Sequence, residues 1–290
     1  MLTAVADEHI VAATAATISF QVVDQHGDAA DPGGAVTVTV TSSDGTAMHT
    51  DQATAGVGSD PRTFTLTRAN TATVDQLTAT WSLSGVVLGS TVVDIIGGPL
   101  ISRADFVARE PKRSDVSDAA FRAARREVTD LLYRTCHRSF VPRFSVERIH
   151  VGSHRHYRGH DVLSLRYPNL RRVAWARDED GNTIDVSSVP PSDGPLAVLL
   201  DTHWPCGWVT IGYEHGYASP PEDLRGAVAA HIAANIVEGS SSLSPRAQST
   251  TTPLGTTSFV PIAGYGKAIT GIPHVDEAYN AHTWDQPSVA

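Results

Sequence analysis

Cysteine is scarce in this sequence: among 290 residues only Cys136 and Cys206 carry a thiol. Their wide separation matches neither a metal-binding spacing nor the even framework of a small disulfide-stapled domain. A disulfide between them is the less favoured alternative. We therefore expect both thiols to be reduced and to belong to hydrophobic cores.

Long hydrophobic runs are also missing. No stretch approaches the ~20 apolar residues that a membrane helix requires. The first residues, MLTAVADEH, lack the basic region and the apolar run of a signal peptide. Because 41% of the residues are hydrophobic, the chain can still build sizeable cores. We expect a globular protein with neither a membrane span nor an export signal.

Motifs for common catalytic chemistry are absent as well. The sequence has no GxSxG nucleophile motif, and neither cysteine has a base beside it in the sequence. The glycines at positions 97 and 98 open no helix pattern and have no lysine partner, so they do not form a phosphate-binding motif. The sequence thus predicts neither nucleophilic catalysis nor a nucleotide site.

Lysine is nearly absent, and charge is unevenly divided. Two lysines stand against twenty arginines, a bias that suits forked contacts at interfaces but that a GC-rich genome also produces; we give the genomic cause more weight. Residues 1–98 hold 2 basic and 10 acidic side chains, residues 99–177 hold 17 and 8, and residues 178–290 hold 3 and 13. This pattern fits nucleic-acid contact by the basic band, head-to-tail packing of copies, or simply solvated surfaces.

The first 98 residues predict a sandwich of antiparallel strands. Four runs alternate hydrophobic with polar residues, and turn sequences with glycine and aspartate separate them. The hydrophobic positions are Ile18, Phe20, Val22, Val36, Val38, Val40, Phe64, Leu66, Leu77, Ala79, Trp81 and Leu83. Short strands at this spacing are typical of an immunoglobulin-like domain, here without the paired cysteines of antibody domains.

Residues 99–240 predict an α+β domain in which two long helices bracket a small antiparallel sheet. The first helix is capped by Ser117 or Ser114 and has Phe121, Ala124, Val128, Leu131 and Leu132 at helical spacing. Five or six strands follow, with a hairpin turn at Asp180 and Gly181. The second helix follows Pro220 and Pro221, and Gly239 suits its C-terminal cap. Its hydrophobic stripe comprises Leu224, Ala227, Val228, His231, Ile232 and Ile236.

Residues 241–290 predict an extended C-terminal arm. Serine, threonine, glycine and proline interrupt any long regular element, while isolated apolar residues remain. A polar arm with apolar anchors is typical of a segment that becomes ordered on a partner. The anchors are Phe259, Val260, Ile262, Ile269 and Ile272. The alternative is a C-terminus that merely trails from a finished domain.

The order of four segments carries a family resemblance. These are the basic first helix ending in CHRSFVPR, the strand leading into YEHG, the helix PPEDLRGAVAAHIA and the tail TGIPHVDEAYNAH. Together they resemble the head-to-tail adaptor (connector) proteins of long-tailed bacteriophages. The resemblance covers roughly residues 100–280, rests on order and spacing, and leaves out the N-terminal domain.

The resemblance implies a structural protein of the virion neck and no cofactor. It implies a homo-oligomeric ring of about twelve copies, binding to the portal protein at the head-tail junction and to a downstream neck or tail component. Genomic DNA would pass through the lumen without sequence-specific binding, and assembly would take place in the host cytoplasm. The helices would contact neighbouring subunits and the arm would grip the portal.

Arginines of the first helix are the candidates for these contacts. Arg122, Arg125 and Arg126 share one helical face, and Arg134 lies further along the same helix. Arg138, Arg171 and Arg172 complete a set that could also contact nucleic acid, although no DNA-binding motif frames it. Tight phosphate binding in a channel would hinder passage of DNA. We therefore expect the arginines at subunit or portal contacts and acidic residues toward the lumen.

Two other classes of function stay open. His154, His156 and His160 crowd one segment, and three imidazoles can hold a metal ion for hydrolysis. The segment is similar to the HxHxDH motif of metallo-β-lactamase-like hydrolases, but Arg158 replaces the aspartate and the last histidine comes one residue late. The third class is a surface- or carbohydrate-binding sandwich, for which Trp81, on a strand where burial is expected, offers little.

A cluster of aromatic residues and histidines surrounds the last predicted strand. Such a cluster can line a ligand pocket, but it more often forms a core rim or a protein interface, which we favour. Its members are His203, Trp204, Trp208, Tyr213, His215 and Tyr217.

Overall fold

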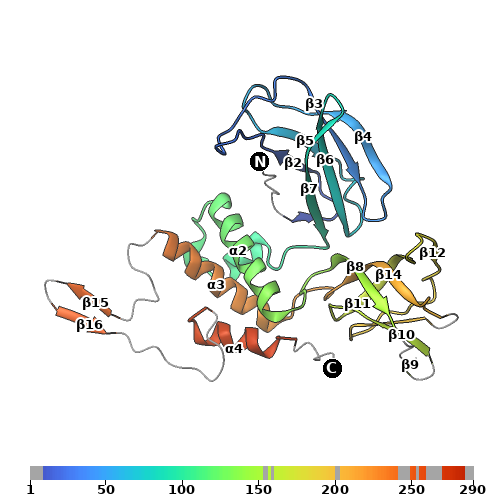
Figure 1. Cartoon of the computed structure of the whole chain (residues 1–290). Coiled ribbons are helices and arrows are strands. Elements are labelled where there is room, and N and C mark those ends of the chain that lie inside the picture. The colour runs from blue at the N-terminus through green and yellow to red at the C-terminus, as the bar shows by residue number, and fades with distance from the viewer. Residues whose placement is uncertain are drawn as a thin grey trace. The chain divides into compact units, whose positions relative to one another are not determined.

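The chain folds into two compact units, each made of two separate stretches of sequence. The computed structural model describes residues 9–152, 156–157, 160–199, 203–240, 249–252, 255–258 and 270–284 (Figure 1). The first unit, the strand unit, comprises residues 1–98 and 141–218; the second, the helical unit, comprises residues 99–140 and 219–290. The three-part division expected from the sequence stays a prediction.

Residues 9–98 of the strand unit form an antiparallel sandwich with one short parallel edge. Its strands are β1 (Ile10–Val11), β2 (Ala16–Phe20), β3 (Val36–Thr41), β4 (Ala47–Ala53), β5 (Arg62–Leu66), β6 (Asp75–Leu83) and β7 (Val86–Ile96). One sheet has the order β1-β7-β6-β3-β4, and β2 pairs with β5 in the other. The strand pair β1 and β7 is parallel. The sandwich is confirmed as two sheets, and its immunoglobulin-like type stays a prediction.

Alternation of hydrophobic residues builds the core of this sandwich. Val36, Val38 and Val40 are at most 3% exposed, and the intervening threonines face outward, as the period of a strand requires. Phe20 stacks on Trp81 with ring centroids 5.5 Å apart. Trp81 is fully buried, and its indole N–H donates to the Thr91 hydroxyl (3.3 Å). The expected burial of Trp81 is thus confirmed, so it offers no surface for a glycan.

The rest of the strand unit is built from two further antiparallel sheets. Its strands are β8 (Arg143–Val151), β9 (His156–Tyr157), β10 (His160–Ser164), β11 (Leu170–Arg177), β12 (Thr183–Ile184), β13 (Leu196–Leu199) and β14 (Gly207–His215). The orders are β12-β11-β14-β8 and β13-β10-β9. Residues of both sheets share one core, which includes Leu163, Ala197 and Ile211. The turn predicted at Gly181 joins β11 to β12, where its φ of 86° requires glycine.

Gly212 on β14 allows two aromatic rings from the neighbouring strands β8 and β11 to pack closely against it. A methyl group at this position would lie 2.4 Å from the Trp175 ring and 2.9 Å from the Phe144 ring. The Trp175 indole N–H then reaches the Ser43 hydroxyl (3.1 Å), in the turn between β3 and β4. The missing side chain of Gly212 therefore helps to join the two parts of the strand unit.

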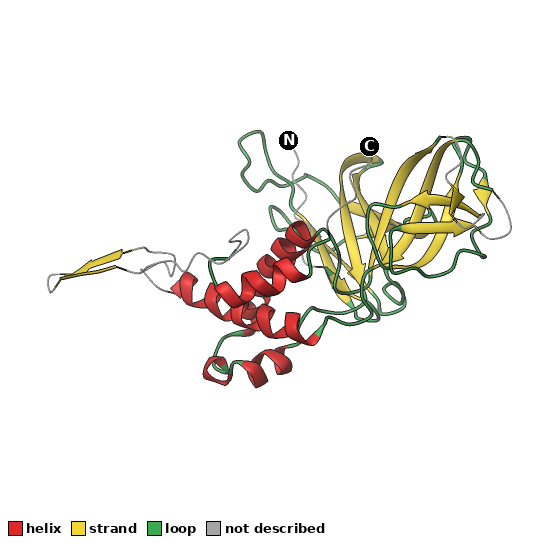
Figure 2. Cartoon of the chain, turned by 90° about the horizontal axis from the view of Figure 1, so that it is seen from below, coloured by secondary structure: helices red, strands yellow, loops and turns green. Residues whose placement is uncertain are grey.

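The helical unit packs its helices against one another (red in Figure 2). Its elements are α1 (Arg103–Arg109), the 3₁₀ turn η1 (Pro111–Arg113), α2 (Asp118–Cys136), α3 (Glu222–Ser240), the hairpin β15 (Ser249–Thr252) and β16 (Gly255–Ser258), and α4 (Pro273–Ala281). The two long helices predicted from the sequence, α2 and α3, are confirmed with 19 residues each.

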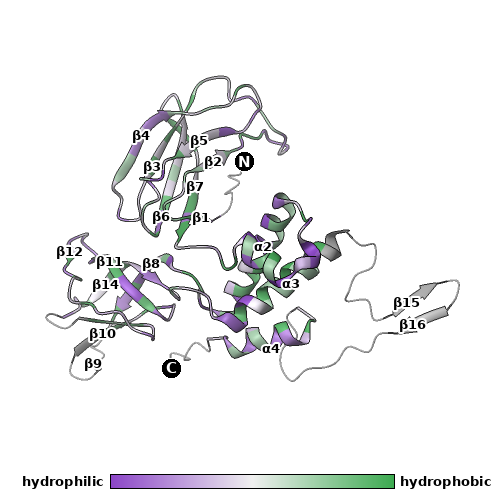
Figure 3. Cartoon of the chain, turned by 180° about the vertical axis from the view of Figure 1, so that it is seen from behind, coloured by the Kyte–Doolittle hydropathy of each residue, from purple (hydrophilic) through white to green (hydrophobic). Residues whose placement is uncertain are grey.

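The helix signals in the sequence hold in detail for α2. Ser117 is its N-cap, where the side chain accepts a hydrogen bond from the Ala120 N–H (3.2 Å). Phe121, Ala124 and Val128 are buried, and hydrophilic residues alternate with them along the ribbon (Figure 3). The left-handed His137 (φ 52°) ends the helix.

Two expectations for the helical unit are wrong. Gly239 does not cap α3, because the helix continues to Ser240. Residues 273–281, expected within an extended arm, form the helix α4. The reason is that Val275 and Tyr279, four residues apart, form a fully buried face on α4, which packs against α2 and α3. Such a short helix becomes stable mainly through tertiary packing, which the local sequence does not display.

Within the described residues, no helix is long and apolar enough to cross a membrane.

Candidate assembly surfaces

One arginine, Arg103, holds the loop that leads into α2. The Arg103 side chain of α1 donates hydrogen bonds to the backbone carbonyls of Ser114 (3.2 Å) and Val116. Its guanidinium also lies 5.3 Å from the centre of the Phe121 ring and 3.5 Å from the Asp118 carboxylate. Arg103 thereby fixes the loop between α1 and α2, and with it the orientation of the basic helix.

The first turn of α3 is held by ion pairs from two sides. Glu222 accepts hydrogen bonds from Arg109 of α1 and from Arg225 of its own helix. The bond from Arg109, followed by the charges of both arginines, lowers the pKa of Glu222 below its usual value. Asp223 in the same turn pairs with His282 at 2.9 Å, and this contact lowers the pKa of Asp223. Both ends of the helical unit's sequence therefore meet at the start of α3.

Three helices meet at a buried polar contact. Nδ1 of His231 on α3 lies 3.0 Å from the Tyr279 hydroxyl on α4. The Cys136 thiol on α2 donates to the Tyr279 carbonyl oxygen (3.4 Å). Burial raises the pKa of Cys136 to about 11. Burial, with the nearby Cys136 and Asp276, also raises the pKa of the Tyr279 hydroxyl above its usual value. Both groups therefore stay neutral at physiological pH, so this contact is structural.

The predicted contact arginines lie along α2. Arg122, Arg126 and Arg134 are exposed. Arg125 is half-buried, with its guanidinium 5.4 Å from the centre of the Phe121 ring, and Arg134 Nε donates back to the Asp130 carbonyl (3.3 Å). The helix thus presents a cationic surface on the side away from its buried stripe. Their role in subunit or portal contacts stays a prediction.

Arg171 and Arg172, the other arginines considered for nucleic-acid contact, face a single acid. Arg171 Nε lies 2.7 Å from one Glu214 carboxylate oxygen and Arg172 Nε lies 3.1 Å from the other. Arg171 also borders a polar groove of about 370 Å³, with Asn169, Leu170, Pro191, Ser192 and Asp193. Glu214 therefore offsets part of the charge of these two residues.

The predicted anchors of the arm are mostly outside the described residues. This applies to Phe259, Val260, Ile262 and Ile269. Ile272 is half-buried and is the N-cap residue of α4, where it accepts backbone hydrogen bonds from Val275 and Asp276. The Asp276 carboxylate in turn accepts bonds from the Thr270 N–H (2.7 Å) and hydroxyl (2.8 Å). Ile272 therefore belongs to the start of a packed helix.

The histidine cluster is described only by its backbone. His154 and all three side chains lie outside the described residues, while the backbones of His156 and His160 lie on β9 and β10. Elsewhere in the part of the chain that the structure describes, no three histidine, cysteine or acidic side chains are placed to hold a metal ion. The metal-dependent hydrolase stays an untested alternative.

The aromatic cluster around β14 divides between core and surface. Trp204, Tyr213 and His215 are at most 1% exposed. His215 stacks on Tyr167 with ring centroids 4.6 Å apart, and its Nε2 lies 3.0 Å from the Ser145 hydroxyl. Burial, and secondarily the Arg143 charge, lower the pKa of His215 to about 3. The neutral imidazole is thus part of the core.

Trp208, by contrast, is exposed, and so is Cys206. The side chain of Trp208 is 42% exposed. Arg148 on β8 lies over the Trp208 ring, 4.9 Å from its centre. No local pattern in the sequence indicates this pair, because the two residues are 60 positions apart and meet only through the register of β8 and β14. Cys206, expected in a core, is exposed because it lies in the loop before β14 rather than in the alternating strand.

Comparisons with known proteins give distant structural likenesses. No protein-family model matches the chain, and no curated protein matches it. Among solved structures it is similar to a chain in the neck of the native GTA (gene transfer agent) particle, computed with C12 symmetry. The identity is 15% and the TM-score 0.40, over 67% of this chain and 98% of that one.

A second likeness is to a chain in the neck of the empty GTA particle, computed with C6 symmetry. The identity is again 15% and the TM-score 0.41, over 63% of this chain and 91% of the other. Both solved structures are necks of GTA particles. TM-scores of 0.40 and 0.41 lie below the values that indicate a shared fold, so these likenesses carry no inference about function.

Proposed function

We propose that this chain is a structural subunit of a virion neck, a head-to-tail adaptor that forms a ring between the portal and the next neck or tail component. Its role would be to join these parts and continue the DNA channel, without catalysis, cofactor or sequence-specific DNA binding. The sandwich is then an appendage of the ring subunit.

The observation that carries this proposal is that three of the four resemblance segments contribute residues to the helical unit. The segment CHRSFVPR begins at Cys136, the last residue of α2, PPEDLRGAVAAHIA leads into α3, and TGIPHVDEAYNAH contains α4. The strand leading into YEHG, β14, belongs to the strand unit. Tyr279 of the last segment contacts both Cys136 and His231, one from each of the other two segments, in the buried centre of the unit. Three segments that carry the adaptor resemblance therefore pack together through Tyr279.

Charge supports assembly through many modest contacts. The exposed arginines of α2 lie in the basic region of a chain whose regions 1–98 and 178–290 carry net negative charge. In a ring the same contact recurs between every pair of neighbours, so modest interfaces add up to a stable assembly. We propose the arginines of α2 for contacts with neighbouring subunits or the portal. For a portal contact we propose the apolar residues of the arm, Phe259, Val260, Ile262, Ile269 and Ile272.

The first test is the mass of the full chain by light scattering, alone and with portal-bearing particles from the same virus. The proposal predicts a ring of about a dozen copies, formed alone or only on the portal. A chain that stays monomeric or dimeric and does not bind the particles would contradict the proposal. In that case, metal analysis of untagged protein purified without chelator would test the hydrolase alternative.

A paired substitution tests the helix contact. Arg125→Glu with Arg126→Glu should prevent ring formation or portal binding because it reverses two of the positive charges on α2, at the half-buried Arg125 and the exposed Arg126. Arg68→Glu reverses the charge of an exposed arginine in a turn of the sandwich and should leave assembly intact. Normal ring formation and portal binding by the Arg125/Arg126 variant would contradict the proposed assembly contacts of α2.

A further inference from the structure

One face of the four-stranded sheet carries an exposed aromatic and cationic surface. Val146, Arg148 and His150 alternate on β8 and point outward together, and Val146 is 37% exposed. Trp208 on β14 is the direct cross-strand neighbour of His150, whose ring meets the indole edge to face at 5.1 Å. We call Val146, Arg148, His150 and Trp208 the tryptophan patch.

The contacts within the tryptophan patch fix its side chains in place. The Arg148 guanidinium lies 4.9 Å above the centre of the Trp208 ring, within the range of a cation–π contact. Arg148 has no ion-pair partner among the described residues. Tryptophan and arginine are the residue types that contribute most to binding at protein interfaces. A rigid, exposed arginine of this kind calls for a carboxylate on its partner.

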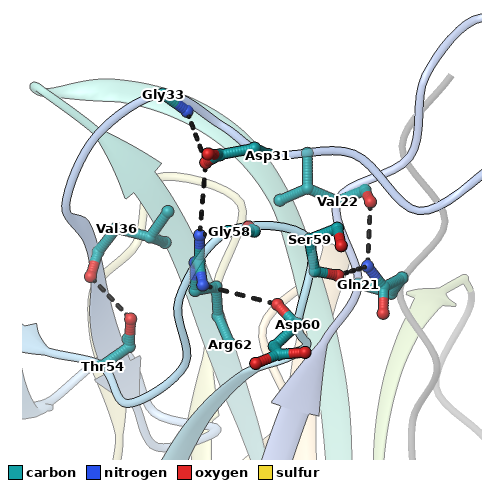
Figure 4. A network of polar contacts seen from close by, with 10 residues as sticks. All are labelled: Gln21, Val22, Asp31, Gly33, Val36, Thr54, Gly58, Ser59, Asp60 and Arg62. Atoms are coloured by element: carbon teal, nitrogen blue, oxygen red, sulfur yellow. Dashed lines mark hydrogen bonds and ion pairs between the residues drawn. The ribbon is translucent and has the colours of Figure 1, made fainter.

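An acidic surface lies on the same chain, at one loop end of the sandwich. Arg62, 3% exposed, donates to the carbonyl of Gly58 (2.8 Å) and lies 3.7 Å from the Asp31 carboxylate (Figure 4). Gln21 bonds the carbonyls of Val22 and Ser59, both at 3.0 Å. These bonds hold two loops side by side, and the exposed acids on them are Asp24, Asp28, Asp31 and Asp60. We call these four residues the acidic loop end.

We propose that the tryptophan patch of one copy docks on the acidic loop end of a second copy of this chain. Subunits in a ring meet through heterologous contacts, which require two different and mutually complementary surfaces on every copy. The tryptophan patch supplies the cation and the apolar centre, and the acidic loop end supplies the carboxylates. The inference rests on the proposed ring and identifies one of its subunit contacts.

A crosslink between two different variants tests the contact directly. Cys206 is an exposed thiol two residues before Trp208, and Cys136 is buried. One sample is the wild-type chain, and the other carries Asp28→Cys with Cys206→Ser. A short bismaleimide should yield a covalent dimer in the mixture and in neither sample alone. Absence of the dimer from the mixture, at concentrations where rings form, would overturn the proposal. A covalent dimer in the wild-type sample would also overturn it, because it would join two copies of Cys206 across a two-fold contact.

Charge reversal gives a second readout. Arg148→Glu should weaken self-association at least tenfold, and adding Asp28→Arg with Asp60→Arg to the same chain should restore most of it, because both surfaces then exchange sign. Arg68→Glu, at an exposed turn of the sandwich, is the matched control and should have little effect. Equal effects of Arg148→Glu and Arg68→Glu, or failure of the compensating changes, would contradict the contact.

Different results would contradict the proposed ring and the proposed contact between the tryptophan patch and the acidic loop end. Rings that persist in the Arg148→Glu variant would overturn this contact and leave the ring intact. A wild-type chain that is monomeric alone and on portal-bearing particles would overturn the ring and this contact together.

Discussion

The Cys136 thiol on α2 donates a hydrogen bond to the backbone carbonyl of Tyr279 on α4, across 143 positions of sequence. The bond joins the end of the basic helix to the last helix of the chain. Close by, the Trp284 N–H donates to the Cys136 carbonyl at 2.8 Å. The C-terminal helix is therefore part of the helical core.

This arrangement predicts that the two cysteines react very differently. Burial raises the pKa of Cys136 to about 11, so almost no thiolate exists at pH 8, and the side chain is also inaccessible. Iodoacetamide should therefore label only Cys206 in the folded protein and both residues in denaturant. Mass spectrometry of the digested protein measures this, and rapid labelling of Cys136 in the native chain would contradict the packing of α4 on α2.

Removing the Tyr279 hydroxyl should destabilise the helical unit. Tyr279→Phe leaves Nδ1 of the buried His231 without the partner that it has at 3.0 Å. An unpaired buried polar group costs about 1–3 kcal/mol. Urea unfolding measures the decrease in the free energy of unfolding, and circular dichroism at 222 nm follows the loss of helix. The matched control is the double variant with His231→Leu, which removes both partners and should recover part of the stability; no recovery would show that the two side chains are not coupled.

The start of α4 depends on the Asp276 carboxylate. It accepts three hydrogen bonds, from the Thr270 N–H, the Thr270 hydroxyl and the Gly271 N–H, at 2.7, 2.8 and 3.1 Å. Asp276→Ala should therefore destabilise this helix by roughly 2–3 kcal/mol. Hydrogen exchange of the α4 amides should speed up accordingly. Glu277→Ala changes the neighbouring, exposed acid, and it should leave exchange nearly unchanged.

The stability of the strand unit should fall in acid because of His215. Its pKa in the folded chain is about 3, below its ordinary value of 6.5. Between these values the unfolded state binds a proton that the folded state does not. Stability should therefore decrease as pH falls from about 6.5 toward 3, by about 1.4 kcal/mol for each pH unit.

Tryptophan fluorescence during urea unfolding measures this effect, because most of the tryptophans lie in the strand unit: Trp81, Trp175, Trp204 and Trp208. His215→Phe should remove this part of the pH dependence, whereas substitution of the exposed His26 by Gln should keep it. An unchanged slope in His215→Phe would show that other groups cause the acid sensitivity.

A single methyl group at position 212 should disturb the strand unit. Gly212→Ala would place a carbon 2.4 Å from the Trp175 ring and 2.9 Å from the Phe144 ring. The rings would have to shift, which typically costs about 1–3 kcal/mol. Thermal unfolding followed by tryptophan fluorescence tests this. Gly152→Ala is the control, since a side chain there meets nothing within 4 Å; equal stability of the two variants would contradict the steric role of Gly212.

The sequence by itself determined the elements whose stabilising pattern is local. Ser117 and the buried spacing of Phe121, Ala124 and Val128 specify α2, and alternating valines specify β3, because a helix repeats every 3.6 residues and a strand every two. The arginines of α2 could be placed on a helix for the same reason. The contacts that they make with other subunits remain predictions.

Only the tertiary structure decided which distant residues meet. The helix α4 forms in a region with weak local signals because Tyr279 finds His231 and Cys136. Arg148 meets Trp208 through a strand register that no local pattern specifies. Such contacts depend on the closure of long loops and on the shape of a shared core, and these are properties of the whole fold rather than of any segment.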